Sequence, residues 1–206
     1  MNIPIENGQL TYFPDFLTAP AQLRCFELLS QTLAWKQDEI NIFGKRVPIP
    51  RLQAWYGDPE ALYTYSGIQM QPSPWTDELL QLKEHVELTS NCHFNSMLAN
   101  LYRDGMDKVG YHADDEPELG EQPIIASLSL GCTRKFTLKH NQTDEKVSID
   151  LTGGSLLIMA GDTQQYYKHA LMQQKKVVGG RINLTFRYTY PVKSPASNVS
   201  NANGLR

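Results

Sequence analysis

Hydrophobic residues recur at helical spacing in two segments of the N-terminal half of the chain. Segment 18–34 is expected to form a helix in which Thr18 supplies the N-cap and the apolar positions face a core. Segment 74–89 shows the same pattern more strongly, with Ser73 as the expected N-cap and Pro74 at the first helical position. Both apolar faces are expected to pack against the rest of the chain rather than to bind a ligand.

Between and after these helices, the pattern changes to that of short strands. Ile40–Pro48 is expected to form a hairpin at the edge of the structure, because prolines at its exit cannot donate to a neighbouring strand. From residue 94 onward, the apolar runs that predict strands are Phe94–Tyr102, Ile124–Leu130, Lys135–Leu138, Val147–Leu151, Ser155–Met159 and Arg181–Tyr190. Many short strands with turn signals are typical of a sandwich or barrel, so the expected fold class is mainly β with flanking helices.

The length of 206 residues fits one structural domain. Within it, residues 1–93 are expected to form an N-terminal extension with helices, and residues 94–193 a β-rich core. Residues 194–206 are rich in Ser and Asn and poor in apolar residues, so we expect a disordered tail.

Charge and cysteine content narrow the class of protein. The net charge of −3 argues mildly against tight nonspecific binding to duplex nucleic acid, although a local basic rim is compatible with it. Three scattered cysteines are too few for a disulfide framework, and we interpret them as reduced thiols of a cytoplasmic protein. No apolar run reaches transmembrane length, and Met1–Leu10 lacks the features of a signal peptide, so no membrane association is expected.

A candidate metal site begins with His112 and Asp114, which are two residues apart. In an extended segment such residues point to the same side. With His169 as third ligand, they would form the two-histidine, one-carboxylate facial triad that binds Fe(II) and leaves positions open. The motif alone is a weak signal, because a surface salt pair explains it equally well. The remaining histidines, expected to be structural or exposed, are His85, His93 and His140.

The strand Arg181–Arg187 strengthens this hypothesis. Its sequence alternates strictly, so that polar residues share one face and Ile182, Leu184 and Phe186 share the other. Such a polar face usually lies in solvent, but two arginines on it could instead line a barrel interior and bind a dicarboxylate through paired hydrogen bonds. Asn100 and Tyr102 are also two residues apart and are expected to face the same way, and both can donate a hydrogen bond to a carboxylate.

Together these runs resemble the AlkB family of Fe(II)- and 2-oxoglutarate-dependent nucleic-acid dealkylases. The resemblance is carried by Asn100-Leu101-Tyr102, His112-Ala113-Asp114-Asp115-Glu116, His169 and Arg181-Ile182-Asn183-Leu184-Thr185-Phe186-Arg187. Further runs at 50–57, 63–67 and 123–129 resemble the branch that repairs 1-methyladenine and 3-methylcytosine. The likeness covers roughly residues 10–190.

The resemblance implies a double-stranded β-helix, a form of jelly roll, with the N-terminal extension as a nucleotide-recognition lid. It implies Fe(II) held by His112, Asp114 and His169, with 2-oxoglutarate and O2 as cosubstrates. The residues it places around 2-oxoglutarate are Asn100, Tyr102, Arg181, Asn183, Thr185 and Arg187. Of these, Arg181 would bind the distal carboxylate, and Arg187 would lie near the oxoacid end and belong to the catalytic set.

The implied activity is oxidative demethylation of alkylated bases in single- or double-stranded DNA by a monomer, with RNA as a further candidate substrate. Formaldehyde, succinate and carbon dioxide would be released. Methylation at these positions makes the base cationic and blocks its pairing, so it flips readily into a pocket. The expected substrate-binding residues are Arg51, Tyr63, Tyr65, Asp115, Glu116 and Phe43.

Charge and shape give these residues their expected roles. The tyrosines offer faces for a flat cation, and Asp115 and Glu116 add negative charge beside it. Phe43 lies in the expected hairpin, where an aromatic side chain can fill the gap left by a flipped base, or can simply pack on the lid. Two other functions stay open, namely an oxygenase acting on tRNA, mRNA or protein, and a non-catalytic jelly-roll module that binds nucleic acid or a metal.

Overall fold

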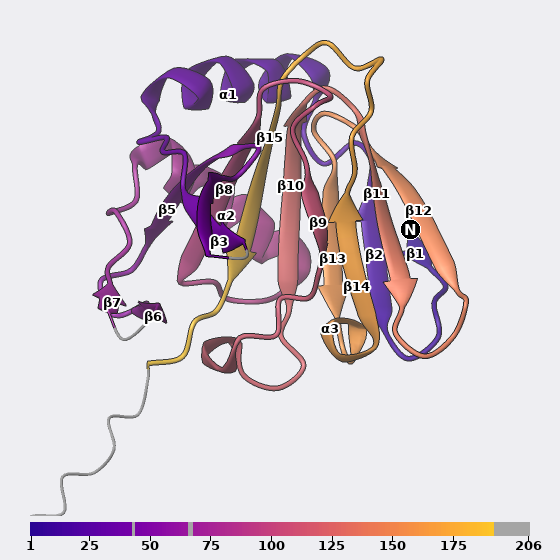
Figure 1. The fold of residues 1–206 in the computed structure, drawn as a ribbon. Coiled ribbons are helices and arrows are strands. Elements are labelled where there is room, and N and C mark those ends of the chain that lie inside the picture. Colours follow the sequence, from indigo (N-terminus) through magenta and orange to yellow (C-terminus); the bar gives the residue numbers. More distant parts are fainter. Residues whose placement is uncertain (43, 66–67, 192–206) are drawn as a thin grey trace, which may run out of the picture.

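Two antiparallel sheets form the body of the computed structural model, which describes residues 1–42, 44–65 and 68–191 (Figure 1). The seven-stranded sheet has the order β1-β2-β13-β10-β15-β8-β5, and the four-stranded sheet the order β12-β11-β14-β9. The larger sheet contains β1 (Asn2–Ile3), β2 (Gln9–Phe13), β5 (Leu52–Gly57), β8 (Ser96–Tyr102), β10 (Ile125–Gly131), β13 (Leu156–Ala160) and β15 (Arg181–Arg187). The smaller contains β9 (Val109–His112), β11 (Arg134–His140), β12 (Lys146–Leu151) and β14 (Tyr167–Leu171). This arrangement is the expected double-stranded β-helix.

Two helices cover the outer face of the larger sheet (Figure 1). Helix α1 (Ala19–Thr32) contacts β10 and β15, and α2 (Asp77–Ser90) contributes Leu79 and Val86 to the same apolar cluster. The Thr18 side chain accepts a hydrogen bond from the Ala21 amide, which confirms it as the N-cap of α1. A second apolar cluster fills the space between the two sheets. The sheets are therefore held by separate cores on the two faces of the larger one.

The start of α2 differs from the expectation. The helix begins at Asp77 after the N-cap Thr76, whose side chain accepts from the Leu79 amide. Ser73 instead donates its amide to the Trp55 carbonyl and accepts from the Gly57 amide, so it extends the edge of β5. This pairing with β5 satisfies the backbone N–H and C=O groups of Ser73, whereas the first N–H groups of a helix have no partner within the helix. The prediction was wrong because the sequence does not show that β5 lies beside Ser73.

The six expected strands all form, with boundaries shifted by a few residues, and the last ends at Arg187 rather than Tyr190. Within the two sheets, strands β1, β2, β5, β9 and β14 were missing from the expectation. Apart from β2, which alternates, they show no clear alternation of polar and apolar residues, and they become strands because partners lie on one or both sides. Strands β1, β2 and β5 come from the first 93 residues, so that segment also completes the larger sheet.

Two separate hairpins stand beside the sheets (Figure 1). The first is β3 (Glu39–Ile42) with β4 (Lys45–Pro48), which confirms the expected hairpin, and Gly44 at its turn has a φ of +79°. The second is β6 (Tyr63–Tyr65) with β7 (Ile68–Met70). Phe43 and the expected tail at 194–206 lie outside the described residues. The shorter helical turns are α3 (Thr163–Tyr166) and the 3-10 turn η1 (Pro117–Leu119).

All three cysteines are free thiols. In the part of the chain that the structure describes, no helix combines the length and apolar character required to cross a membrane.

Candidate active site

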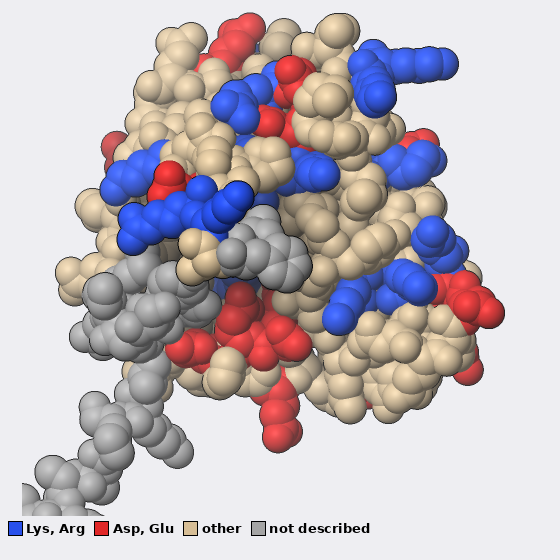
Figure 2. All heavy atoms as spheres, viewed as in Figure 1, with Lys and Arg blue, Asp and Glu red and all other residues tan. Residues whose placement is uncertain are grey.

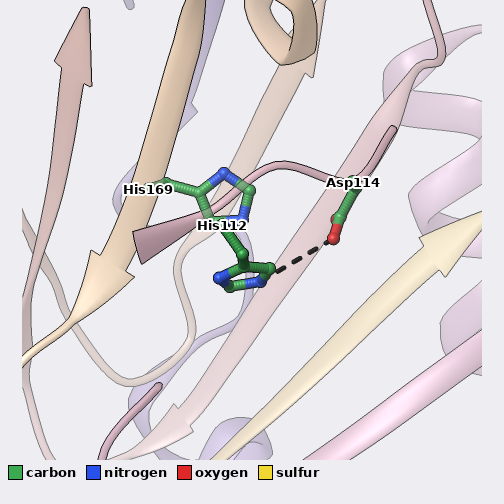
Figure 3. Close-up of side chains that lie close together, drawn as sticks. All are labelled: His112, Asp114 and His169. Atoms are coloured by element: carbon green, nitrogen blue, oxygen red, sulfur yellow. Dashed lines mark ion pairs between the residues drawn. The ribbon is translucent and has the colours of Figure 1, made fainter. Parts of the chain in front are cut away.

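The expected metal ligands come together between the two sheets. His112 ends β9 and pairs in register with His169 on β14, and Asp114 follows two residues later. One ligand atom from each residue lies within 4.8 Å of the others, and the His112 Nε2 atom lies 3.8 Å from Asp114 Oδ1 (Figure 3). Among the described residues this is the one such group of His, Cys, Asp or Glu. His85, His93 and His140 lie outside it, as expected.

The protonation states suit metal binding. Burial lowers the pKa of His169 to about 4, so its imidazole is neutral at neutral pH. Burial raises the pKa of the Asp114 carboxyl, but its interactions, the largest of them with the positive charge of Arg187, outweigh burial, and the net pKa lies below its usual value. The site therefore offers a carboxylate and unprotonated imidazole, as ligands must.

Hydrogen bonds aim these ligands and show that a metal fits them. The Nδ1 atom of His112 lies 2.9 Å from the Gly110 carbonyl oxygen, a contact that leaves Nε2 free to ligate. The Asp114 amide donates to the Gln164 side chain. The buried Nδ1 atom of His169 has no hydrogen-bond partner within the described residues. This ring nitrogen is therefore not occupied by another protein group in the site where the metal would bind. Two imidazoles and a carboxylate on one side are the donor set of Fe(II) oxygenases.

The polar face of β15 lines the interior, which is the less usual of the two placements that the alternation left open and the one that the resemblance implied. Arg181, Asn183 and Thr185 are buried on the side facing the four-stranded sheet, while the apolar residues between them pack under the helices. Nη2 of Arg181 donates to Asn183 Oδ1, and Asn183 Nδ2 donates to Thr185 Oγ1. The same pocket, of about 70 Å³, is lined by the metal ligands.

Arg181 is built to bind an anion. Its side chain is 2% exposed and donates hydrogen bonds to the hydroxyl of Ser129 and to the side-chain oxygen of Asn183. Both acceptors are uncharged, and no carboxylate among the described residues forms an ion pair with the guanidinium. Its buried Nε atom has no partner in that part of the chain. Burial lowers its pKa to about 10, so it stays charged at neutral pH. A buried unpaired charge is costly, and a dicarboxylate would supply the missing partner.

Tyr102 lies directly opposite Arg181 on β8. Burial raises the pKa of its phenol above the usual value, although nearby arginines oppose the shift, so the hydroxyl remains a hydrogen-bond donor at neutral pH. The side-chain oxygen Oδ1 of Asn100 already accepts from Arg51 Nε and Gln53 Nε2, each at 2.9 Å. Asn100 thus lines the pocket and holds Arg51, another of its lining residues.

Arg187 joins the metal ligands to the end of β15. Its Nη2 atom lies 3.0 Å from Asp114 Oδ1, and its buried Nε atom has no partner among the described residues. An arginine that pairs with a metal-ligating carboxylate holds that carboxylate in its ionised form. Arg187 also lines the adjoining cavity described next.

A larger cavity of about 440 Å³ opens beside the small pocket. The two share Arg51, Gln53, Leu98 and Arg187 in their linings. The β3 end of the first hairpin supplies one wall, and Trp55 and Glu116 line the cavity from other elements. Burial raises the pKa of the Glu116 carboxyl although Arg187 opposes the shift, and Oε2 has no partner among the described residues.

The structure brings together some of the expected substrate residues and separates others. Arg51 and Glu116 line the 440 Å³ cavity. Asp115 is exposed and lines a different polar hollow, which extends to Lys168, so it does not share the cavity of Glu116. The backbones of Tyr63 and Tyr65 lie in β6, and their side chains, like Phe43, fall outside what the structure describes.

Sequence reasoning missed several residues that shape the site. Ser127 donates to Asn183, and Ser129 accepts from Arg181, because β10 pairs with β15 in the register Ser127↔Thr185 and Ser129↔Asn183. Alternation of serines with apolar residues in β10 was the available signal. Gln164 and Gln53 carried no comparable signal, because their contacts depend on strands and turns distant in sequence.

Comparison with known proteins agrees with this geometry. The sequence profile of the 2OG-Fe(II) oxygenase superfamily matches residues 9–187. The Bos taurus protein named alpha-ketoglutarate-dependent dioxygenase alkB homolog 3 is 43% identical over 198 residues, which cover 91% of this chain and 68% of that protein. The chain belongs to the AlkB family. As a member of the 2OG-Fe(II) oxygenases it is a dioxygenase that uses Fe(II), 2-oxoglutarate and O2.

Other AlkB relatives extend the comparison. The Homo sapiens alkB homolog 3 is 41% identical and covers 91% of this chain and 68% of its own length. The Bos taurus DNA oxidative demethylase ALKBH2 is 40% identical over 74% of this chain and 58% of its own length. Among solved structures, that of OsALKBH1 superposes with a TM-score of 0.65 at 19% identity, covering 91% of this chain and all of the other, which supports the shared fold.

Proposed function

We propose that this AlkB-family dioxygenase oxidatively demethylates alkylated bases, with 1-methyladenine and 3-methylcytosine in DNA as its main substrates and RNA as a further one. The observation that carries the proposal is the wall that the two cavities share. Arg187 lines both the pocket of the metal ligands and Arg181 and the cavity of about 440 Å³, which is also lined by Glu116, whose buried Oε2 atom has no partner among the described residues. A cationic base would supply the partner that this carboxyl lacks.

The names of the relatives support DNA as the substrate class. One group of relatives is named DNA oxidative demethylase, and the other is named alpha-ketoglutarate-dependent dioxygenase alkB homolog 3. Both groups are about 40% identical to this chain over the residues that match, which are 91% of the chain for one and 74% for the other.

A row of lysines on the outer face of the four-stranded sheet also supports a nucleic-acid partner. Lys139 pairs in register with Lys146 on one side and Lys168 on the other. Adjacent strands lie about 4.8 Å apart, so these like charges are close and destabilise the free protein. A phosphate backbone would relieve that repulsion. In Figure 2, blue side chains gather over this sheet at the lower right, beside a red group near the lower centre.

The chain's own residues would divide the work as follows. Arg181 and Tyr102 would bind the distal carboxylate of 2-oxoglutarate, and His112, Asp114 and His169 would hold the iron. When bound, iron and 2-oxoglutarate supply the oxidising chemistry, in which succinate and carbon dioxide are released and the methyl carbon leaves as formaldehyde.

Positioning is the other task of the protein. Arg187 would keep the Asp114 carboxyl ionised at the boundary between the two cavities. The β3–β4 hairpin and Glu116 would orient the base and limit access of water. Roles for Tyr63 and Tyr65 as base-stacking residues, and for Phe43 as a duplex wedge, remain predictions.

A substrate panel tests the proposal. Formaldehyde release is compared for methylated single-stranded DNA, duplex DNA, RNA and a methylated peptide, at one fixed salt concentration with Fe(II) and 2-oxoglutarate. The proposal expects release from the methylated DNA. Release from the peptide alone would support the protein-directed oxygenase, and the absence of succinate with every substrate would support a non-catalytic binding module.

A further inference from the structure

Arg134 is a buried cation that the proposed reaction does not use. It begins β11, and its side chain is fully buried, with 0% exposure. Its guanidinium donates to the carbonyl oxygens of Asp104, Asp107 and Met172 at 2.8–3.0 Å, and to the side-chain oxygen of Gln174 at 3.2 Å. All four acceptors are uncharged groups. The hydrogen bonds are therefore satisfied, but the positive charge is not paired directly with a carboxylate.

The charge of Arg134 lies close to the cosubstrate pocket. The Cζ atom of Arg134 is 5.8 Å from the centre of the Tyr102 ring, and the Cζ atom of Arg181 is 5.4 Å from the same centre. The electrostatic influence of Arg134 extends to both neighbours, because it lowers the pKa of Arg181 and opposes the rise in the pKa of Tyr102. Two buried guanidinium groups thus share one tyrosine, with no carboxylate among the described residues bound directly to either.

The contacts of Arg134 also fix the position of Tyr102. The segment 103–108 runs from Tyr102 on β8 to the start of β9, the strand that ends in His112. Arg134 binds this segment at two carbonyls and binds Met172 just after β14, the strand of His169. The side chain of Arg134 therefore links the end of β8, the strand of Tyr102, to β9 and β14, the strands of His112 and His169.

We propose that Arg134 is a specificity-determining and positioning residue for 2-oxoglutarate, which makes the pocket select a dicarboxylate through a second positive charge behind Tyr102. It acts without touching the cosubstrate, since Tyr102 and Arg181 line the pocket and Arg134 does not. Its charge favours the distal carboxylate, and its hydrogen bonds hold Tyr102 at a fixed distance from the metal ligands. The inference concerns cosubstrate binding only, so it holds whichever substrate the enzyme oxidises.

The test compares two oxoacids that differ at the distal end. 2-Oxoglutarate and 2-oxobutanoate share the oxoacid group, but only the first has a distal carboxylate. Their dissociation constants are measured by calorimetry with the Fe(II)-loaded full chain under anaerobic conditions. In Arg134→Gln we expect the preference for 2-oxoglutarate to fall on the order of tenfold, the scale of one unit charge acting at this range through a partly screened interior. Equal losses for both acids would mean a merely structural role and would overturn the proposal.

A second variant keeps the test decisive if Arg134→Gln does not fold. Gln174 accepts from Arg134 Nε and is partly exposed, so Gln174→Glu would place a carboxylate on the guanidinium while leaving Arg134 in place. We expect it to lower the same preference, by less. An unchanged ratio in Gln174→Glu would overturn the role of the charge.

Two further variants separate charge from position. Arg134→Lys keeps the charge and loses the multiple anchoring bonds, so both acids should bind more weakly while their ratio stays near that of the unaltered enzyme. A ratio as low as in Arg134→Gln would contradict the proposal. Lys135→Gln is the matched control, because this exposed neighbour pairs with Asp150 on the outer face, and the same change of charge there should leave the ratio unaltered.

Discussion

The pocket that holds the chemistry and the hairpin that borders the substrate cavity are built in opposite ways. Arg181, Asn183 and His169 are all buried and lie on strands paired on both sides within the sheets. The β3–β4 hairpin is a sheet of two strands, and all four residues of β4 are exposed. The one ion pair among its described residues joins Arg46 to Glu39, and it is long at 3.9 Å and solvent-exposed.

This difference locates two kinds of function. Ligand geometry must be held within fractions of an ångström, and doubly paired strands provide that for His169 and Arg181, while His112 on the edge strand β9 is held by its pairing with His169. A two-stranded hairpin is marginally stable by itself, so it can adapt to a substrate at little cost. We therefore expect changes in the pocket to abolish the reaction, and changes around the hairpin and outer surfaces to alter which substrate reacts.

The largest effect should come from the metal ligands. His112→Ala, Asp114→Ala and His169→Ala should each abolish turnover and weaken iron binding, because three ligands on one side are the minimum that holds the metal and keeps positions open. Succinate release and bound iron are the measurements. His93→Ala, at an exposed histidine, is the control. Near-normal activity in any of the three would remove that residue from the ligand set.

The next largest effect should come from Arg181. Losing one partner of a buried charge pair costs about 2–5 kcal/mol, so Arg181→Ala should raise the 2-oxoglutarate requirement on the order of a hundredfold or more. Arg181→Lys should also raise it, because lysine keeps the charge without the paired geometry. The apparent KM for 2-oxoglutarate is the measurement, with iron content as the control. An unchanged value would assign the carboxylate to another residue.

The same contrast explains what the sequence could predict. The pocket was predictable because its residues lie on strands with strict alternation, as in Arg181–Arg187, and alternation decides which side chains share a face. The helix start at Asp77 was not predictable, because Ser73 pairs with Trp55 and Gly57 of β5 and the sequence does not show this pairing. Cross-strand partners such as Ser129 depend on register, which the sequence alone does not specify.

Asp115 and Glu116 show the same limit within one turn. They are adjacent and equally acidic in sequence, but the chain direction after Asp114 places Glu116 in the 440 Å³ cavity and Asp115 in an exposed hollow. Their shared role in the base pocket was a prediction from proximity along the chain. Position in space separates them, and it makes Glu116 the residue to test.

Glu116→Gln should narrow the discrimination between cationic and neutral lesions, on the order of several-fold to tenfold for one partly screened charge. The isosteric amide removes the charge and keeps the shape. Formaldehyde release from 3-methylcytosine is compared with turnover of a neutral etheno adduct. Glu118→Gln, two residues further along the chain, is the matched control. Equal losses on both lesions would show that Glu116 acts structurally.

The smallest effect should come from the lysine row. Each phosphate contact contributes about 0.7 to the salt dependence of single-strand binding, so neutralising Lys139, Lys146 and Lys168 to Gln should reduce the slope of log K against log salt by about 2. Turnover of a methylated mononucleotide should not change. Lys175→Gln with Lys176→Gln, at exposed loop positions, is the control. An unaltered slope would remove this face from the nucleic-acid interface.

The most direct test of a single demethylase site measures succinate and formaldehyde together. The enzyme is supplied with Fe(II), 2-oxoglutarate, oxygen and a single-stranded DNA that carries one 3-methylcytosine, and both products are counted against repaired base. We expect equal amounts of all three from the unaltered enzyme, and none of them from Asp114→Ala. Succinate released without formaldehyde or repaired base, at any enzyme concentration, would contradict the claim that the metal pocket and the adjoining cavity form one demethylase site.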